Sequence, residues 1–527
     1  MKKRTGRSPM NLLDSSPVSL AAAQLAVPIF GLALLVPLWS HGRAAAGHAA
    51  RLMAAALVFA VTAATVVAVQ GSVDWRSAGG LVSFRFDALS ATLLVLVSFL
   101  GLVVTRYSVN YLNGDPRQAR FTRALLATLA SVLLLAIAGN LLQFVVCWTA
   151  TSLGLHRLLT FPSGSRSAAL AARKKFLISR LGDACLIGAL ALVWKGFGTW
   201  DFAALFAAAE NPGPAQAAVL PWVAWLVVAA ALMKSAQLPF HSWLPETLDT
   251  PTPVSALMHA GLINAGGFLI VRLSPLLVQA PGALDALAAV GGATALFGSL
   301  VMMTQPSIKR SLAWSTISQM GFMMLQCGLG AFALAMLHLV AHSLYKAHAF
   351  LASGGVVAKT RPEFATSPAA RPLALIGALG AAAVLAAAGG AVFGFGASGP
   401  GPLLLGSVFL MALAQLVAAL AAGPWRPRLA FWGLLAAAGT AAAGLGLHKL
   451  FGHWLADCLP AYTPQHGPAA HLLMAGAGLL FLALILVQAQ AARGTAPAWL
   501  ARLYVHASNG FYLGTLLERL TRRLLPL

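Results

Sequence analysis

Apolar stretches long enough to cross a lipid bilayer recur along this chain from about residue 22 to about residue 490. Each holds roughly 18 to 22 residues, the length that an α-helix needs to cross a hydrocarbon core of about 30 Å. Only 9% of the residues are charged, whereas soluble domains carry about 25%. The pattern predicts an all-α polytopic membrane protein of about 14 transmembrane helices, without a soluble domain.

The predicted helices divide the chain into four parts. A hydropathy window of about 19 residues places the helices near residues 22–40, 52–70, 87–105, 122–138, 140–160, 174–195, 218–238, 252–273, 284–304, 308–327, 330–357, 372–395, 402–422, 428–449 and 470–491. We expect a basic N-terminal tail (1–21), a transmembrane core that holds the ionisable side chains (22–360), transmembrane helices rich in small residues (361–495) and a basic amphipathic C-terminal segment (496–527). Because small residues let helices approach closely in lipid, the third part is predicted to be a packing scaffold.

The net charge of +22 comes from 35 Lys and Arg against 13 Asp and Glu. Most of these bases lie in short connections or at the termini, which is typical of cytoplasmic loops that contact anionic lipid headgroups. The charge therefore indicates a lipid bilayer as partner and no nucleic acid. The basic tail and the basic loop 106–123 both favour the cytoplasmic side, but three predicted helices separate them, so the orientation of the N-terminus stays open. The first apolar stretch is interpreted as a transmembrane helix and not as a removed signal peptide.

The most informative position is Lys234, because an ionisable side chain inside a transmembrane helix costs about 2.5 to 3.5 kcal/mol of insertion free energy unless it is paired or faces water. Lys234 ends a long uncharged stretch, and Pro239 and Pro245 then predict a helix break, before Pro251 and Pro253 begin the next helix. Carbonyls freed by such a break are tolerated in a membrane only where protein or a water-filled cavity satisfies them. We interpret Lys234 as a proton carrier beside the break. The alternative is that the Lys234 side chain extends to the membrane surface and places its ammonium group in water.

Further ionisable side chains follow in the apolar helices. For His259, a proton relay and a hydrogen bond between helices are both open. His338, His342 and Lys346 are spaced four residues apart and lie along one side of a single helix. Because histidine titrates near neutral pH, they predict a hydrated proton path. A hydrogen-bonded core is the alternative, and zinc is disfavoured because no third ligand lies nearby.

Asp183 lies inside a predicted helix, three residues after Arg180. It forms an ion pair with that arginine on one helix face, or it is the counter-charge of a neighbouring lysine, and both can hold. The chain has no phosphate-binding loop, no dinucleotide fingerprint and no paired carboxylates for acid–base chemistry. We therefore expect a transporter subunit and not an enzyme, with no catalytic residue, metal or cofactor of its own.

Three long motifs resemble the antiporter-like proton-translocating subunits of NADH:quinone oxidoreductase (subunit L type) and of Mrp antiporters. They read KSAQLPFHSWLPETLDTPTPVSALMHAGLINAGGFL, SIKRSLAWSTISQMGF and HLVAHSLYKAHAFLASGG, and the resemblance covers about residues 80–360. It implies that Lys234 is the central lysine on the first broken helix and that His259 is the connecting histidine. His338, His342 and Lys346 then form the next segment of the proton path.

Two departures distinguish this chain from the respiratory subunits. Trp148 is followed by Thr149, where the respiratory subunits carry a glutamate, and the last predicted helices are not followed by a long lateral helix. The motifs TSLGLHRLLTF, AARKKFLISRLGD and RYSVNYLNGDPRQARF are instead similar to the DabB family, the membrane subunits of DAB inorganic-carbon accumulation systems. The missing glutamate leaves Asp183, or a group on a partner, as the counter-charge of Lys234.

The DabB resemblance implies a multi-pass protein of a bacterial inner membrane, with a large DabA-type peripheral subunit on the cytoplasmic face. Cation flux through the membrane subunit, expected to be of protons, would drive hydration of CO2 to bicarbonate at a carbonic-anhydrase-like zinc site in that partner. Its interface is expected at the basic connections 106–123 and 157–175. A proton-pumping subunit of a respiratory complex and a self-sufficient cation/proton antiporter are the alternatives, and sodium coupling and the direction of flux stay open.

Overall fold

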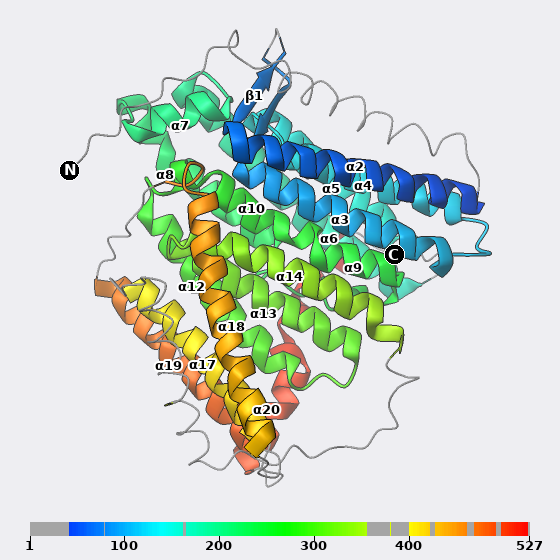
Figure 1. Ribbon diagram of the computed structural model, residues 1–527, viewed down its shortest axis with the longest axis vertical. Coiled ribbons are helices and arrows are strands. Elements are labelled where there is room, and N and C mark those ends of the chain that lie inside the picture. Colours follow the sequence, from blue (N-terminus) through cyan, green and yellow to red (C-terminus); the bar gives the residue numbers. More distant parts are fainter. Residues whose placement is uncertain are drawn as a thin grey trace. The chain divides into compact units, whose positions relative to one another are not determined.

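The computed structural model describes residues 42–77, 80–161, 165–355, 400–421, 427–460, 468–491 and 497–524, together with Gly380. This described part of the chain is mostly helical (Figure 1). Its contacts form two compact units. Unit 1 comprises Met1–Phe161 and Val193–Asn211, and unit 2 comprises Pro162–Leu192 and Pro212–Leu527. Helix α6 (Arg166–Phe197) contributes residues to both units.

Unit 1 is built on long apolar helices. Its elements are α2 (Gly42–Gln70), β1 (Val73–Arg76), β2 (Ser83–Phe86), α3 (Ala88–Tyr111), α4 (Gln118–Ala136), α5 (Leu141–Leu159) and α7 (Phe202–Glu210). Helix α2 packs against α3 and α4, and α4 packs against α5 (blue to cyan in Figure 1). Thr149 lies on α5, directly after the buried Trp148.

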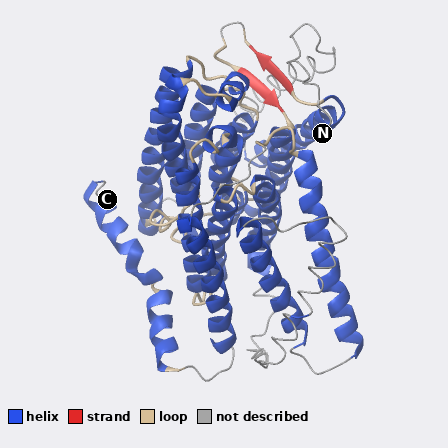
Figure 2. Ribbon diagram, turned by 90° about the vertical axis from the view of Figure 1, so that its left-hand side faces the viewer, coloured by secondary structure: helices blue, strands red, loops and turns tan. Residues whose placement is uncertain are grey.

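Strands β1 and β2 form an antiparallel hairpin with Val73 opposite Phe86. They are the only strands in the described residues (red in Figure 2). The all-α prediction missed this hairpin, because strands of four residues are too short for their alternation to stand out from apolar flanks.

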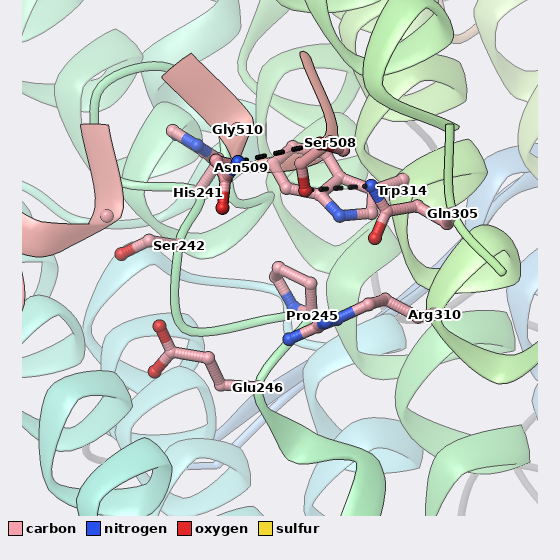
Figure 3. Close-up of a pocket in the computed structure, with 11 residues that line it drawn as sticks. His241, Ser242, Pro245, Glu246, Gln305, Arg310, Trp314, Ser508, Asn509 and Gly510 are labelled. Atoms are coloured by element: carbon pink, nitrogen blue, oxygen red, sulfur yellow. Dashed lines mark hydrogen bonds between the residues drawn. The ribbon is translucent and has the colours of Figure 1, made fainter. Parts of the chain in front are cut away.

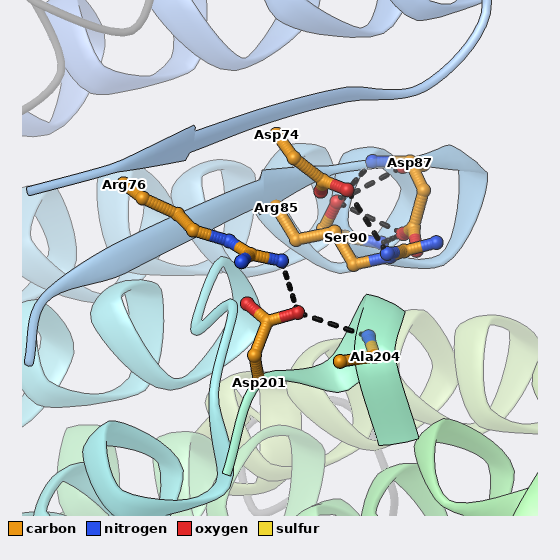
Figure 4. Close-up of polar contacts among 7 residues, drawn as sticks. All are labelled: Asp74, Arg76, Arg85, Asp87, Ser90, Asp201 and Ala204. Atoms are coloured by element: carbon orange, nitrogen blue, oxygen red, sulfur yellow. Dashed lines mark hydrogen bonds and ion pairs between the residues drawn. The ribbon is translucent and has the colours of Figure 1, made fainter. Parts of the chain in front are cut away.

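An ionic network holds the hairpin to the helices of unit 1 (Figure 4). Arg85 Nε lies 2.9 Å from Asp87 Oδ2, and Arg85 Nη1 lies 3.1 Å from Asp74 Oδ2. Asp87 in turn caps the start of α3, where its Oδ1 accepts a hydrogen bond from the Ser90 amide at 2.9 Å. Burial raises the pKa of the Asp74 carboxyl, although Arg85 opposes that shift.

A second ion pair in the same network fastens the hairpin to α7. Arg76 pairs with Asp201, whose Oδ1 also accepts a hydrogen bond from the Ala204 amide at 3.0 Å. Because Asp201 caps the first turn of α7, the hairpin and this short helix are held by the same carboxylate.

Unit 2 holds the remaining helices. These are α8 (Pro214–Lys234), α9 (Thr252–Ala260), α10 (Ala265–Arg272), α11 (Ser274–Leu277), α12 (Pro281–Met302), α13 (Ile308–Gly328), α14 (Phe332–Ala352), α17 (Pro400–Ala421), α18 (Pro427–Trp454), α19 (Pro468–Ala491), α20 (Ala498–Ser508) and α21 (Leu513–Leu524). Single 3₁₀ turns lie at Thr247–Asp249, Leu262–Asn264, Ser353–Gly355 and Gly510–Tyr512.

Helices α12 and α13 approach each other closely because glycines face the opposite backbone. A Cβ added to Gly321 would lie 2.7 Å from the Gly291 carbonyl oxygen, and one added to Gly328 would lie 2.6 Å from the Leu284 oxygen. Close contact through small residues is the usual way in which helices associate in lipid. Helix α13 of this pair also packs against α14, which carries the ionisable residues.

Helix α17 packs against both α18 and α19 (yellow to orange in Figure 1). A buried apolar cluster joins α17 and α19 to the end of α13, and it consists of Leu325, Leu329, Leu404, Leu405 and Met474. The role of a scaffold for this part of the chain stays a prediction.

Eight helices of the described residues are long and apolar enough to cross a membrane. They are Arg43–Gln70, Ala88–Tyr111, Gln118–Ala136, Arg166–Phe197, Pro214–Lys234, Thr252–Arg272, Pro281–Met302 and Phe431–Trp454. The predicted total of about 14 is not confirmed, and the predicted helices 22–40 and 372–395 lie outside the described residues, as does the tail 1–21. Helix α14 is present as predicted but is not among the eight, since its histidines and lysine lower its hydropathy.

Candidate functional site

The first helix break follows Lys234, the last residue of α8. The chain then runs without an α-helix through Pro239 and Pro245 until α9 begins at Thr252, and Pro253 lies in the first turn of α9 after Pro251 at its N-cap. Lys234 itself is half-buried.

Polar groups in unit 2 satisfy the backbone at this first break. The Gln237 amide donates to the Leu232 carbonyl at 2.9 Å, and its side-chain Nε2 donates to the Ser235 carbonyl at 2.8 Å. The Leu238 amide donates to Thr294 Oγ1 of α12 at 3.1 Å. Protein groups therefore satisfy backbone hydrogen bonds at the break. Non-helical backbone at membrane depth is tolerated only with such partners.

A second break, which the sequence did not reveal, lies in the next helix. Helix α9 ends at Ala260, Gly261 leaves helical geometry (φ −125°, ψ −67°), and α10 begins only at Ala265 after a 3₁₀ turn. Three carbonyls near this break accept hydrogen bonds from side chains: His259 O from His342 Nε2 at 3.2 Å, Ala260 O from Asn264 Nδ2 at 2.8 Å, and Ile263 O from Ser235 Oγ at 2.7 Å. Because Ser235 adjoins Lys234, the end of α8 lies against the second break.

The predicted row on α14 is present in the structure. His338 Nδ1 lies 2.9 Å from Gln326 Oε1, and His342 Nδ1 lies 2.6 Å from Gln319 Oε1. The two imidazole rings are 6.1 Å apart between centroids. Both partners of His342, Gln319 Oε1 and the His259 carbonyl, are oxygens, and an imidazole donates to two acceptors at once only in its protonated form, because the neutral ring has a single N–H.

His259 belongs to the same cluster. The side chain is 2% exposed, its Nδ1 lies 3.0 Å from Thr316 Oγ1 of α13, and its ring stacks on Phe350 at 4.3 Å between centroids. Since its backbone carbonyl is the partner of His342, and the His342 ring lies near that of His338, the three histidines form one cluster across α9 and α14.

Lys346 ends the row on α14 and is completely buried. Its Nζ donates to the Leu312 carbonyl at 3.1 Å and to the Ser315 hydroxyl, and it lies 5.6 Å from the centroid of the Tyr345 ring. These acceptors are neutral oxygens, which stabilise an ammonium group without fixing its charge as a carboxylate would.

Helix α6 brings further charges to the site. Arg180 and Asp183 form the predicted ion pair at 2.7 Å. Asp183 also attracts Lys234 and the buried Lys175 electrostatically, while Lys175 and Lys234 repel each other. This surrounding fits Asp183 as the counter-charge of Lys234, a role that stays a prediction.

Sequence reasoning missed Lys174 and Glu246. The Lys174 Nζ lies 2.6 Å and 2.7 Å from the two carboxylate oxygens of Glu246, and the lysine side chain is wholly buried. Outside the membrane-spanning segments, burial raises the pKa of the Glu246 carboxyl, and Lys174 opposes that shift. The run of bases at the start of α6 is the available signal, but from the sequence it belongs to the basic connection 157–175, which is expected at the partner interface and not in a buried ion pair.

Within the described residues, no three His, Cys, Asp or Glu side chains come close enough together to hold a metal ion. The arrangement consists of amines, imidazoles, amides and hydroxyls around two helix breaks. Such groups can accept and donate protons.

Comparison with known proteins shows that the chain is similar to antiporter-like membrane subunits. The family model described as NADH:quinone oxidoreductase/Mrp antiporter, TM matches residues 138–436, and that of the complex I chain 5 N-terminus matches residues 75–122. The chain is 41% identical over 461 residues to a protein of Halothiobacillus neapolitanus named probable inorganic carbon transporter subunit DabB2, covering 84% of this chain and 81% of the relative. It is 42% identical over 289 residues to NADH-quinone oxidoreductase subunit L of Mycobacterium tuberculosis, covering 54% of this chain and 45% of the relative.

Among solved structures, the Mrp complex of Dietzia sp. contains a similar chain. The TM-score is 0.59 at 24% identity, covering 97% of this chain and 57% of that chain. At this identity the likeness concerns the fold, and it agrees with the antiporter-like architecture expected from the sequence.

Proposed function

Because this chain belongs to the NADH:quinone oxidoreductase and Mrp antiporter transmembrane family, among its DabB-like members, we propose that it is the membrane subunit of an inorganic-carbon accumulation complex. It is an antiporter-like, multi-pass membrane protein. In the proposal, cation flux through this chain, of protons, energises hydration of CO2 to bicarbonate. The hydration takes place at a zinc site in a DabA-type partner on the cytoplasmic face of a bacterial inner membrane, and this chain holds no cofactor.

The observation that carries the proposal is the similarity to DabB2 over most of both chains. The similarity to respiratory subunit L covers only about half of this chain. Thr149 on α5 supports the same choice, because by the family resemblance a redox-driven pump would carry a glutamate there.

The proposed proton path uses the contacts at the two breaks. The His338 and His342 rings are 6.1 Å apart, so a proton passes between them through a bridging water. His342 and His259 meet at the His259 carbonyl, and Ser235 links the second break to Lys234. Each charge that moves down a potential of about 100 mV releases about 2.3 kcal/mol, which is the energy available to the partner.

The test is growth in ambient air of a carbonic-anhydrase-deficient bacterium that expresses this chain with a DabA-type partner. The wild-type pair should rescue growth, and Lys234→Ala should fail at equal membrane levels. Lys195→Ala is the matched control, because Lys195 is an exposed lysine near the end of α6, and it should rescue like the wild type.

Failure of a well-expressed wild-type pair would contradict the proposal. The alternatives would then be separated by purification: iron–sulfur and quinone-binding subunits that co-purify would indicate a redox pump. Cation/proton exchange by the chain alone in liposomes would indicate an antiporter.

A further inference from the structure

A polar cavity of about 210 Å³ lies within unit 2 between the first helix break and the C-terminal segment, defined here as residues 497–524 (Figure 3). It is large enough for several water molecules. The residues that line it are His241, Ser242, Pro245, Glu246, Gln305, Arg310, Trp314, Ser508, Asn509, Gly510 and Gly514. None of these residues belongs to the cluster of His259, His338 and His342 described above.

Two buried polar atoms of the lining residues indicate that water enters the cavity. His241 is 1% exposed and Ser242 is 4% exposed, yet neither His241 Nδ1 nor Ser242 Oγ has a hydrogen-bond partner among the described residues. Buried polar groups are almost always satisfied, and water supplies the partner where protein does not. A hydrated cavity accounts for both atoms.

The cavity reaches the buried charges of α6 through one side chain. Glu246 lines the cavity, its side chain is 31% exposed, and both of its carboxylate oxygens contact the wholly buried Lys174. A proton that reaches Glu246 from the cavity is therefore one hydrogen bond away from a base on α6. The same helix carries Lys175 and Asp183 beside Lys234.

The C-terminal segment forms the other wall. A Cβ added to Gly514 would lie 3.2 Å from Ser242 Cβ and 3.9 Å from Glu246 Oε1, and one added to Gly510 would lie 3.4 Å from the Trp314 ring. Gln305 Nε2 donates to the Ser508 carbonyl at 3.4 Å.

The turn that brings this wall into place is conformationally unusual. Phe511 and Tyr512 both have positive φ angles, 50° and 61°, in a region that L-residues rarely adopt. The Phe511 ring packs 5.8 Å from the Phe297 ring of α12. The contact between Phe511 and Phe297 thus helps to hold the C-terminal segment against the cavity, despite the unfavourable φ angles of Phe511 and Tyr512.

We propose that this cavity is a water-filled port through which protons reach Glu246 and Lys174, and that residues 508–514 form its outer wall and set its width. The proposal rests on the proton flux of the proposed function. It assigns a role to the C-terminal segment, which the sequence indicated only as basic and amphipathic.

The first test measures water access by cysteine modification. Purified complex in detergent, with Ser242→Cys in the full chain, is treated with a cationic methanethiosulfonate reagent, and the added mass on this chain is followed over time. The Ser242→Cys thiol should react roughly 10-fold faster or more than that of Ser274→Cys, because modification follows exposure of the thiolate. Ser274 is the control, since it is also buried (0% exposed) but lies on α11, away from the lining of the cavity. The wild-type chain gives the background from its 4 cysteines.

The second test fills the port. Gly514→Leu should reduce proton flux into membrane vesicles, measured with a pH-sensitive dye, roughly 10-fold, because its side chain enters the space beside Ser242 and Glu246. Thr515→Leu, an exposed position on the same helix, should leave the flux unchanged. Glu246→Gln keeps the shape of the port but removes its titratable group, so it should both lower the flux and change the dependence of flux on pH.

Equal reaction of the Ser242→Cys and Ser274→Cys thiols would overturn the proposal, as would wild-type flux in both Gly514→Leu and Glu246→Gln. In either case Lys234→Ala still reports separately on the proposed function, because it tests flux and carbon accumulation without reference to the port.

Discussion

The ionic network of unit 1 and the buried bases of α14 in unit 2 stabilise buried charge in different ways. In unit 1, the buried Asp87 faces the guanidinium of Arg85, and Arg76 faces Asp201. In unit 2, the buried Lys346 donates to a carbonyl and a hydroxyl, and the imidazoles of α14 contact amides.

The difference lies in whether the charge can change. Arginine does not lose its proton in proteins, so its pairs with carboxylates are permanently charged and act as structural ties. Lysine and histidine beside neutral oxygens can exist in either protonation state, because these acceptors do not fix the charge. The comparison predicts that substitutions of the ionisable residues of α14 affect flux and that substitutions in the unit 1 network affect stability.

The largest effect is expected at Lys346. Lys346→Met keeps the length of the side chain but removes its proton, so proton flux in vesicles should fall to background, roughly 100-fold, at unchanged membrane levels. Lys449→Met, at an exposed position on α18, is the control and should retain full flux. Appreciable flux in Lys346→Met would remove this lysine from the path and weaken the contrast between the two networks.

Two substitutions of His342 distinguish its structural role at the second break from its role in proton transfer. In His342→Gln the amide can still donate to the His259 carbonyl but cannot titrate, so flux should fall roughly 10-fold or more while the melting temperature stays close to that of the wild type. In His342→Ala the carbonyl loses its donor, and stability should also fall by about 1 to 3 kcal/mol. Normal flux in a stable His342→Gln protein would show that this histidine only holds the second break.

Arg85 tests the unit 1 side of the comparison. Arg85→Ala leaves the carboxylate of Asp87, 1% exposed, without its cation, which should cost about 2 kcal/mol of stability and lower the thermal midpoint in detergent. Arg76→Ala is the matched control, since its side chain is 43% exposed and such pairs contribute about 0 to 1 kcal/mol. Flux per folded protein should not change in either variant, and a specific loss of flux in Arg85→Ala would break the comparison.

Much of this arrangement could be predicted from the sequence. Apolar length indicated the membrane helices, the prolines after Lys234 indicated the first break, and the spacing of His338, His342 and Lys346 indicated a common helix face. Long apolar runs and fixed spacings are local properties, so they can be recognised in a single sequence.

Other features depend on contacts between distant segments. The break at Gly261 has no proline inside it, and it is stabilised by Ser235 and His342 from other helices. The partnership of Lys174 with Glu246 joins residues 72 positions apart. The cavity is lined by residues of the first break and of the C-terminal segment together. Such juxtapositions arise from tertiary packing, which periodicity and composition do not encode.

The smallest expected effect concerns Asp249, a carboxylate of unit 2 that lies outside the membrane-spanning segments and resembles the fixed acids of unit 1. Hydroxyls of Ser167 and Ser165, the latter at 2.8 Å, donate to Asp249 Oδ2 and hold the pKa of this carboxyl below its usual value. A lowered pKa in the folded state contributes stability above the unfolded value of about 3.9, and that contribution is lost as the pH falls through the folded value. The double substitution Ser165→Ala, Ser167→Ala should therefore lower the thermal midpoint slightly near neutral pH, and this difference from the wild type should shrink at pH values below about 4. A difference that stays constant with pH would mean that the two hydroxyls act on packing alone, and that Asp249 is not a fixed acid of the unit 1 kind.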